Sequence, residues 1–350
     1  MLFSVKEVDR AFYTAHLADF LPARMIDVHT HVWLSAHSGL LRRQVRGAKW
    51  PARVAQECPI EELLETYQLM FPDKQVTPLI FGSAREDVVF SKANAYVSAS
   101  AKRYSLPALL LSTPEWSAQE LEHEVTAGGF LGLKPYLSYA PAYIPEDQIT
   151  IYDFLPPHHL EVADAHGWIV MLHIPRPLRL RDPLNLQQML EIERNYPGVR
   201  LIIAHIGRAY CIEDVGNAFD VLRETERMRF DFSANTNAQV MERLIRTVGP
   251  QRVLFGSDLP ILRMRMRRIC ENGRYINLVP PGLYGDVSDD PHMRVVSAEE
   301  GERLSFFMYE ELYAFRRAAE ATGLTQSEIE DVFCGNATRL LAEARGAGNA

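Results

Sequence analysis

The sequence alternates eight short apolar runs with stretches of helical periodicity, and this alternation limits the fold more than any other feature. The apolar runs are residues 24–30, 75–81, 106–112, 129–134, 168–173, 199–205, 228–233 and 252–257. Their near-continuous Val, Ile and Leu content is typical of parallel strands buried on both faces. The predicted helices are residues 60–71, 86–104, 117–128, 151–166, 185–196, 212–226, 237–248 and 297–322. This order predicts the α/β class and a (β/α)8 TIM barrel.

An open doubly wound sheet is the alternative fold. It would more often carry a glycine-rich phosphate loop after the first strand. No linker-like segment divides the chain, so we expect one domain over residues 24–345 after an N-terminal extension of residues 1–23. Two long connections, residues 33–59 and 259–296, follow strands 1 and 8. Barrel enzymes keep their active sites at the carboxyl ends of the strands, so we expect these loops to wall or cover a pocket.

Charge and cysteine content restrict the partners and the compartment. A net charge of −8 over 350 residues argues against a nucleic-acid or polybasic membrane surface. Charged residues occur throughout residues 1–20 and argue against both a signal peptide and a membrane span there. The cysteines are widely spaced and lack a C-x-x-C motif, which suits isolated thiols in a reducing compartment; they are Cys58, Cys211, Cys270 and Cys334. We therefore expect a cytoplasmic protein that acts on a small molecule.

The segment "MIDVHTHVW" (residues 25–33) ends the first predicted strand with two histidines. Residues at i and i+2 of a strand point to the same face, so His29 and His31 should project together. A divalent metal is the usual partner of two such imidazoles. H-x-H alone is a weak motif, and hydrogen-bonded core histidines are the alternative.

Other chemically versatile residues also stand at the ends of predicted strands. They are Lys134 after strand 4, His173 after strand 5, His205 after strand 6 and Asp258 after strand 8. Each has an ordinary explanation, such as a core histidine, a turn cap or a surface lysine, but a barrel would bring all of them to one mouth. Imidazoles with one carboxylate suit zinc, manganese or ferrous iron. Asp258 could then bind the ion and accept a proton from water, while His205 polarises a carbonyl or shuttles a proton.

Six motifs together resemble a known family. They are "DVHTH" (27–31), "GLKPY" (132–136), "MLHIPR" (171–176), "IIAHIGR" (202–208), "FGSDLP" (255–260) and "CGNATRLL" (334–341). This series resembles the amidohydrolase superfamily, and specifically amidohydrolase family 2, which includes semialdehyde decarboxylases, over residues 24 to 342. The resemblance implies a distorted barrel with a divalent metal. It also implies a closing helix with Asn336 as its N-cap.

Carried over residue by residue, the resemblance assigns metal ligands and a catalytic histidine. The implied ligands are His29, His31, His173 and Asp258, and His205 matches the catalytic histidine. In two-metal members of the superfamily a lysine at the position of Lys134 is carboxylated and bridges the ions, whereas family 2 often keeps it unmodified. We favour one divalent ion, most readily Zn²⁺ with Mn²⁺ possible, over two ions with carboxylated Lys134.

The expected reaction is metal-dependent hydrolysis of an ester, lactone or amide of a small, carboxylated molecule. A Lys134 cation near the metal would stabilise hydroxide and the developing oxyanion. Non-oxidative decarboxylation or hydration of a carboxylic acid is the alternative reaction. A non-catalytic binding protein is a further alternative, although such a relative would usually have lost a ligand. The family's members often associate, so a homo-oligomer is also possible.

Several side chains could bind such a substrate. Arg176 and Arg208 each lie three residues beyond a histidine of the site, and arginine suits bidentate carboxylate binding. Arg263 and Arg265 belong to a basic run, "LRMRMRRIC" (262–270), which could collect an acidic substrate or form a solvated face. Surface ion pairs are the alternative explanation for these arginines. Trp33, Tyr136 and Tyr139 could form aromatic walls, with ordinary packing as the alternative.

Overall fold

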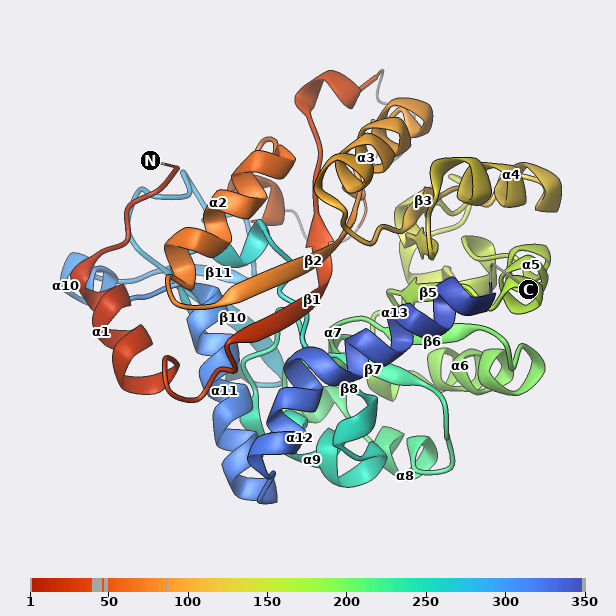
Figure 1. Ribbon diagram of the computed structural model, residues 1–350. Helices are drawn as coiled ribbons and strands as arrows, with labels where there is room; N and C mark the ends of the chain where they lie inside the picture. The colour runs from red at the N-terminus through yellow and green to blue at the C-terminus, as the bar shows by residue number, and fades with distance from the viewer. Residues whose placement is uncertain (1, 40–45, 47–49, 86, 348–350) are drawn as a thin grey trace.

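The computed structural model describes residues 2–39, 46, 50–85 and 87–347, and its strands form a ring surrounded by helices (Figure 1). Strands β1 and β2 form one parallel pair, and strands β3 to β8 form a second parallel sheet in chain order. The strands are β1 (Arg24–His31), β2 (Gln75–Phe81), β3 (Leu110–Ser112), β4 (Gly132–Pro135), β5 (Ile169–Leu172), β6 (Arg200–Ile203), β7 (Arg229–Asp231) and β8 (Val253–Leu254). All eight lie within or one residue beyond the runs predicted from the sequence.

Backbone hydrogen bonds close the two gaps between these sheets. The Ile80 N–H donates to the Pro107 carbonyl at 3.0 Å, which joins β2 to the segment that leads into β3. On the other side, the Val28 N–H donates to the Phe255 carbonyl at 3.0 Å, and the Asp258 N–H donates to the His29 carbonyl at 2.8 Å. The ring is thus a closed α/β barrel, as predicted. The pairing of β1 with β2 shifts register between residues 27 and 30, which distorts the barrel at the H-x-H segment.

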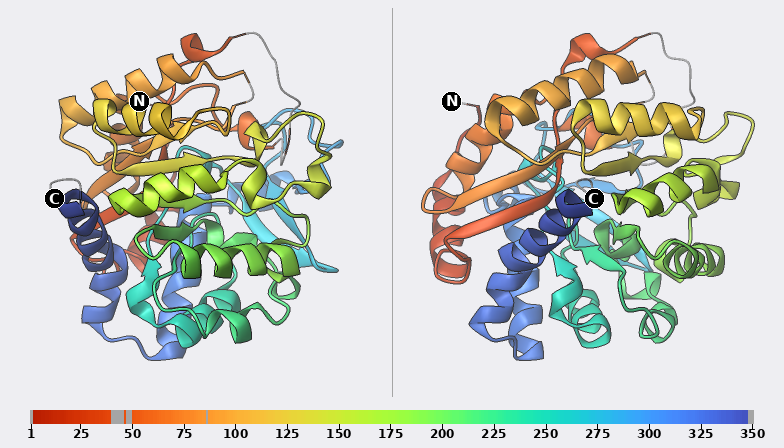
Figure 2. Two further views of the ribbon diagram at one scale, coloured as in Figure 1. Left: turned by 90° about the vertical axis from the view of Figure 1, so that its right-hand side faces the viewer. Right: turned by 45° about the vertical axis from the view of Figure 1, so that its right-hand side comes forward.

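The helices of the described chain lie around the ring and at its ends (Figure 2). They are α1 (Glu7–His16), α2 (Ile60–Met70), α3 (Phe90–Tyr104), α4 (Ala118–Gly128), α5 (Pro157–His166), α6 (Pro183–Asn195), α7 (His205–Arg208), α8 (Ala218–Leu222), α9 (Ala238–Val248), α10 (Ala298–Glu302), α11 (Phe307–Thr322), α12 (Gln326–Glu330) and α13 (Asn336–Ala347). Local signals fix the ends of α4, where the Ser117 hydroxyl accepts from the Glu120 N–H and Gly129 adopts φ +74°. The predicted helix over residues 297–322 is instead two helices, α10 and α11, and the helix predicted over 212–226 is regular only in α8.

The second long connection contains an unpredicted sheet. Strands β9 (Arg267–Glu271), β10 (Arg274–Val279) and β11 (Met293–Val295) pair in the order β11-β10-β9. The disulfide between Cys211 and Cys270 joins β9 to the loop after β6. The expectation of isolated cysteines is therefore wrong for this pair. Their 59-residue separation gives no sign that β9 folds back beside Cys211.

The two ends of the chain pack against the barrel. The Asp9 carboxylate of α1 accepts two hydrogen bonds from the Arg265 guanidinium, at 2.7 and 2.6 Å, and both side chains are buried. At the other end, Ala337 and Leu340 of α13 pack with the residues inside the barrel. The prediction that Asn336 is an N-cap is wrong, because residues 331–335 are already helical and its own backbone is helical. Its side-chain amide donates instead to the Pro250 and Val253 carbonyls, both at 2.8 Å. Among the described residues, no helix has the length and apolar character needed to cross a membrane.

Candidate metal centre and active-site cavity

Three of the four predicted metal ligands meet at the carboxyl end of the barrel. β1 presents His29 and His31, and the loop after β8 presents Asp258 in a left-handed conformation with φ 57°. Asp258 Oδ1 lies 3.1 Å from His31 Nε2 and 3.7 Å from His29 Nε2. One ligand atom from each residue lies within 4.8 Å of the others, which is the arrangement that a single ion requires.

The fourth predicted ligand, His173, lies at the same cavity but outside this tight group. Its ring centroid is 5.2 Å from that of His205, which follows β6. The His173 Nδ1 atom is buried and has no hydrogen-bond partner among the described residues. A buried polar atom without a partner costs free energy, so this edge of the ring fits a ligand that completes the site.

Burial and neighbouring charges set protonation states that suit a cation. Burial lowers the pKa of His29 to about 4, although the Asp231 carboxylate opposes the shift. Burial alone would raise the pKa of Asp258, but the adjacent His31, His205 and His29 side chains lower it to about 2. Neutral imidazole and ionised carboxylate are the forms that bind metal ions. The donor set therefore fits Zn²⁺ or Mn²⁺.

Two residues that sequence analysis missed lie directly behind the centre. Asp231 Oδ2, at the end of β7, is 3.0 Å from His29 Nδ1. Asp231 Oδ1 accepts hydrogen bonds from the His205 N–H at 2.9 Å and from the Ser233 hydroxyl. The Ser233 hydroxyl oxygen and the Ser233 carbonyl lie 2.8 and 3.1 Å from His205 Nδ1. The position of Asp231 at a strand end was the signal that could have identified it.

Lys134 extends from β4 into the protein interior. Its Nζ is buried and has no hydrogen-bond partner in the described part of the chain. It lies 4.6 Å from the centroid of the Tyr136 ring and 5.4 Å from that of Phe81. Burial lowers its pKa from 10.5 to about 8, against the charges of Asp231 and Asp258. Lys134 is therefore a cation at neutral pH with a reduced affinity for its proton.

The centre opens into a cavity of about 300 Å³. Three of the predicted substrate-binding residues, Trp33, Tyr136 and Arg208, line it. Arg176 is absent from the described lining; its guanidinium lies 3.2 Å from Asp182, the N-cap of α6. The long loops contribute walls as predicted, through Trp33 and residues 50–52 after β1 and through Ile261 and Tyr275 after β8. Residues 40–45 and 47–49 of the first loop lie outside the described residues.

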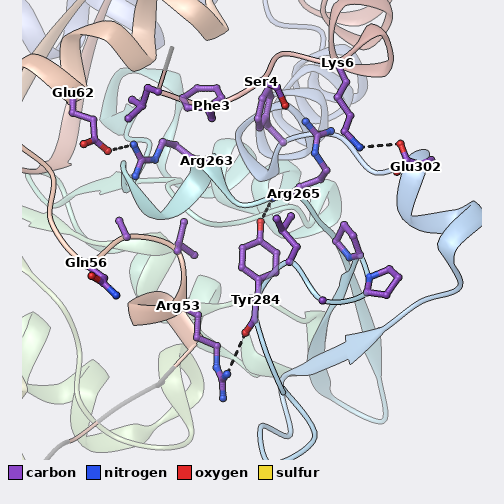
Figure 3. A pocket seen from close by; sticks show the side chains of 18 of the residues that line it. Phe3, Ser4, Lys6, Arg53, Gln56, Glu62, Arg263, Arg265, Tyr284 and Glu302 are labelled. Atoms are coloured by element: carbon purple, nitrogen blue, oxygen red, sulfur yellow. Dashed lines mark hydrogen bonds and ion pairs between the residues drawn. The ribbon is translucent and has the colours of Figure 1, made fainter.

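A larger cavity of about 760 Å³ lies on the other side of the segment that contains Ala55, which lines both cavities. Figure 3 shows that Arg263 and Arg265 belong to this second cavity. Arg263 pairs with Glu62, and Arg265 pairs with the buried Asp9. The sequence-based suggestion that these arginines lie near the metal site is therefore not supported by their position. Both arginines form ion pairs, as the alternative explanation holds, but these pairs are largely buried rather than at the surface.

The fold and the site together define the chain as a barrel protein with a histidine–carboxylate centre at the carboxyl ends of its strands. The family model "Amidohydrolase" matches residues 26–342, so the chain belongs to the amidohydrolase family, whose members are metal-dependent enzymes. This membership confirms the predicted family. No functionally curated protein matches the chain.

Solved structures with the same fold include both hydrolases and decarboxylases. An amidohydrolase from Burkholderia multivorans has a TM-score of 0.58 at 14% identity, covering 91% of this chain and 99% of its own. The 2,6-dihydroxybenzoate decarboxylase from Rhizobium has a TM-score of 0.56 at 14% identity, covering 92% and 99%. A probable 2-pyrone-4,6-dicarboxylic acid hydrolase from Acinetobacter baumannii, with citric acid bound, has a TM-score of 0.56 at 16% identity, covering 91% and 99%. At these identities the likeness shows the fold alone.

Proposed function

We propose that the protein is a metal-dependent hydrolase of an ester, lactone or amide of a small, carboxylated molecule. One divalent ion, Zn²⁺ or Mn²⁺, would be held by His29, His31, His173 and Asp258. The observation that carries the proposal is the convergence of His29 Nε2, His31 Nε2 and Asp258 Oδ1 beside a cavity of about 300 Å³. A divalent ion held there would lower the pKa of water towards about 7 and so supply a nucleophile at neutral pH.

The chain's own residues supply the proton transfers. Asp258 is ionised because its pKa is lowered to about 2, so the oxygen not facing His31 can accept a proton from the attacking water. His205 donates through Nδ1 to the Ser233 carbonyl, which leaves Nε2 to exchange a proton with the substrate. The Lys134 ammonium places positive charge near the centre and stabilises the developing oxyanion.

Arg208 is the side chain best placed to select a carboxylated substrate. It lines the cavity, and its hydrogen bonds to the Ile174 and Pro175 carbonyls, at 3.3 and 3.2 Å, both come from Nη1. In the described structure the Nε and Nη2 hydrogens are therefore left for a substrate carboxylate. Trp33 and Tyr136 present aromatic surface to a ring.

Non-oxidative decarboxylation is the second candidate. Decarboxylases of 2,6-dihydroxybenzoate share the barrel, and a dihydroxybenzoic acid decarboxylase from Polaromonas contains bound manganese. The same cavity would then hold the substrate carboxylate at the metal, and His205 would protonate the ring carbon. The buried Lys134 ammonium favours hydrolysis, because its charge stabilises the oxyanion of a tetrahedral intermediate.

Elemental analysis of protein purified without chelators tests the metal assignment. We expect about one ion per chain in the wild type and almost none in His29→Ala. His123→Ala, which removes an exposed histidine on α4, should keep the metal. Two ions per chain would support carboxylated Lys134 instead, and no uptake of added Zn²⁺ or Mn²⁺ would refute the proposal. The loaded enzyme should release acid from lactones or esters of carboxylated rings, whereas CO₂ release would favour the decarboxylase.

A further inference from the structure

The buried Asp231 carboxylate has its two oxygens in different environments. Oδ1 accepts from the His205 N–H at 2.9 Å, from the Ser233 N–H at 3.1 Å and from the Ser233 hydroxyl. Oδ2 faces His29 Nδ1 at 3.0 Å. Asp231 and His29 are both almost fully buried, with 0% and 1% of their side chains exposed. One oxygen is therefore fixed by three donors, and the other is available to a histidine ring.

We infer that Asp231 is a positioning residue that fixes the tautomer of His29. An ionised carboxylate can only accept, so His29 must carry its hydrogen on Nδ1 and direct the bare Nε2 atom towards Asp258. A ring with the opposite tautomer would present an N–H to the cation position and could not act as a ligand. This inference rests on the proposed metal ligands, although the tautomer itself exists without metal.

The three donors to Oδ1 make the isosteric substitution unusually informative. In Asp231→Asn, the amide oxygen must take the Oδ1 position, because an NH₂ group there would face three N–H and O–H donors. The NH₂ group then takes the Oδ2 position and donates to His29 Nδ1. That hydrogen bond forces the His29 hydrogen onto Nε2, the atom needed for the metal. The substitution leaves the side-chain volume almost unchanged, yet it moves the His29 hydrogen from Nδ1 to Nε2.

Asp27 provides a matched control. It is also fully buried on β1, and its Oδ1 accepts from the His29 and Ser257 N–H groups at 3.1 and 2.9 Å. Its Oδ2 accepts from the Tyr67 hydroxyl at 2.7 Å. In Asp27→Asn the amide oxygen should keep the two backbone donors, and the Tyr67 hydroxyl can turn to accept from the NH₂ group. A hydroxyl tolerates this reversal, whereas a metal-binding imidazole does not.

The experiment combines metal titration with ¹⁵N NMR of histidine-labelled, metal-free protein. His29 is assigned by the signal lost in His29→Gln. We expect wild-type His29 to carry hydrogen on Nδ1, and Asp231→Asn to carry it on Nε2 and to bind Zn²⁺ about 100-fold more weakly. Asp27→Asn should match the wild type in both measurements.

Two results would overturn the inference. One is an Nε2–H tautomer of His29 in the wild type, which needs no variant to fold. The other is unchanged Zn²⁺ affinity in folded Asp231→Asn. If the wild type takes up no metal, the proposed function fails, whereas the tautomer of His29 still decides this inference.

Discussion

The two cavities on either side of Ala55 differ in how their charged side chains are satisfied. The larger one, about 760 Å³, pairs its arginines and lysine with carboxylates or carbonyls, as Lys6 does with Glu302 (Figure 3). The smaller one, about 300 Å³, is lined by His173 and by Tyr136, whose ring centroid lies 4.6 Å from Lys134 Nζ. In the described part of the chain, the buried His173 Nδ1 and Lys134 Nζ atoms have no hydrogen-bond partner. Unpaired buried groups are costly and persist where chemistry needs them. The difference teaches that cavity size is a poorer guide to function here than unsatisfied polar groups.

The largest effect should come from removing the proposed proton acceptor of the smaller cavity. Asp258→Asn keeps the side-chain volume but removes the charge beside His31, so we expect kcat to fall by about 10⁴-fold. Steady-state kinetics on a substrate identified by screening would measure this change. The matched substitution in the larger cavity is Glu57→Gln, at a carboxylate that accepts from the Ser35 N–H at 3.1 Å. Equal losses in the two variants would contradict the contrast between the cavities.

Substitutions in the larger cavity should change the stability of the protein rather than its activity. Arg265→Ala leaves the buried Asp9 charge without its bidentate partner, so we expect the free energy of unfolding to fall by about 3–5 kcal/mol. Denaturant titration measures this change, and the metal content of the folded protein should stay the same. Lys6→Ala, which breaks the more exposed pair with Glu302, should cost less than about 1 kcal/mol. If folded Arg265→Ala lost its metal, the result would instead show that the two cavities are energetically coupled.

The smallest of these effects concerns Lys134 and pH. Activity that depends on the Lys134 ammonium should be complete well below pH 8 and decline as the pH rises through the Lys134 pKa of about 8. The contribution of Lys134 to the free energy of unfolding depends on pH in the opposite direction. Between pH values of about 8 and 10.5, the ordinary pKa of lysine, the unfolded chain binds more protons than the folded protein, so this contribution increases with pH. Lys134→Met should lose the alkaline limb of the pH–rate profile and about 10²-fold in rate. If Lys134→Met keeps the alkaline decline in rate, that decline belongs to the titration of another group.

The barrel could be predicted because its strands are buried on both faces and therefore appear as continuous apolar runs. The same logic located His29, His31 and Asp258, since side chains at the ends of parallel strands share one edge. Asp231 also stands at a strand end, but its role could not be predicted, because its partner, His29 Nδ1, lies on a distant strand. Strand-end position identifies the residues at a site but not which atoms they present.

Features that depend on loop geometry could not be predicted. The bond between Cys211 and Cys270 requires β9 to turn back against the loop after β6, and no local pattern encodes that turn. The position of Arg263 and Arg265 in the second cavity likewise depends on the path of the chain after β8. Asn336 lost its predicted cap role because the helix already includes the five residues before it. In each case long-range packing, rather than local preference, determines the outcome.

The closure of the ring also affects how the protein folds. His31 and Asp258 are 227 residues apart in the sequence and meet only when the end of β8 docks against β1. A contact of such high sequence separation forms late, because the chain entropy lost in closing the loop must first be offset by other contacts. A partly synthesised chain that lacks residue 258 cannot assemble the proposed set of ligands, which includes Asp258. With the proposed ligands, metal uptake during refolding would therefore report the final closure of the barrel.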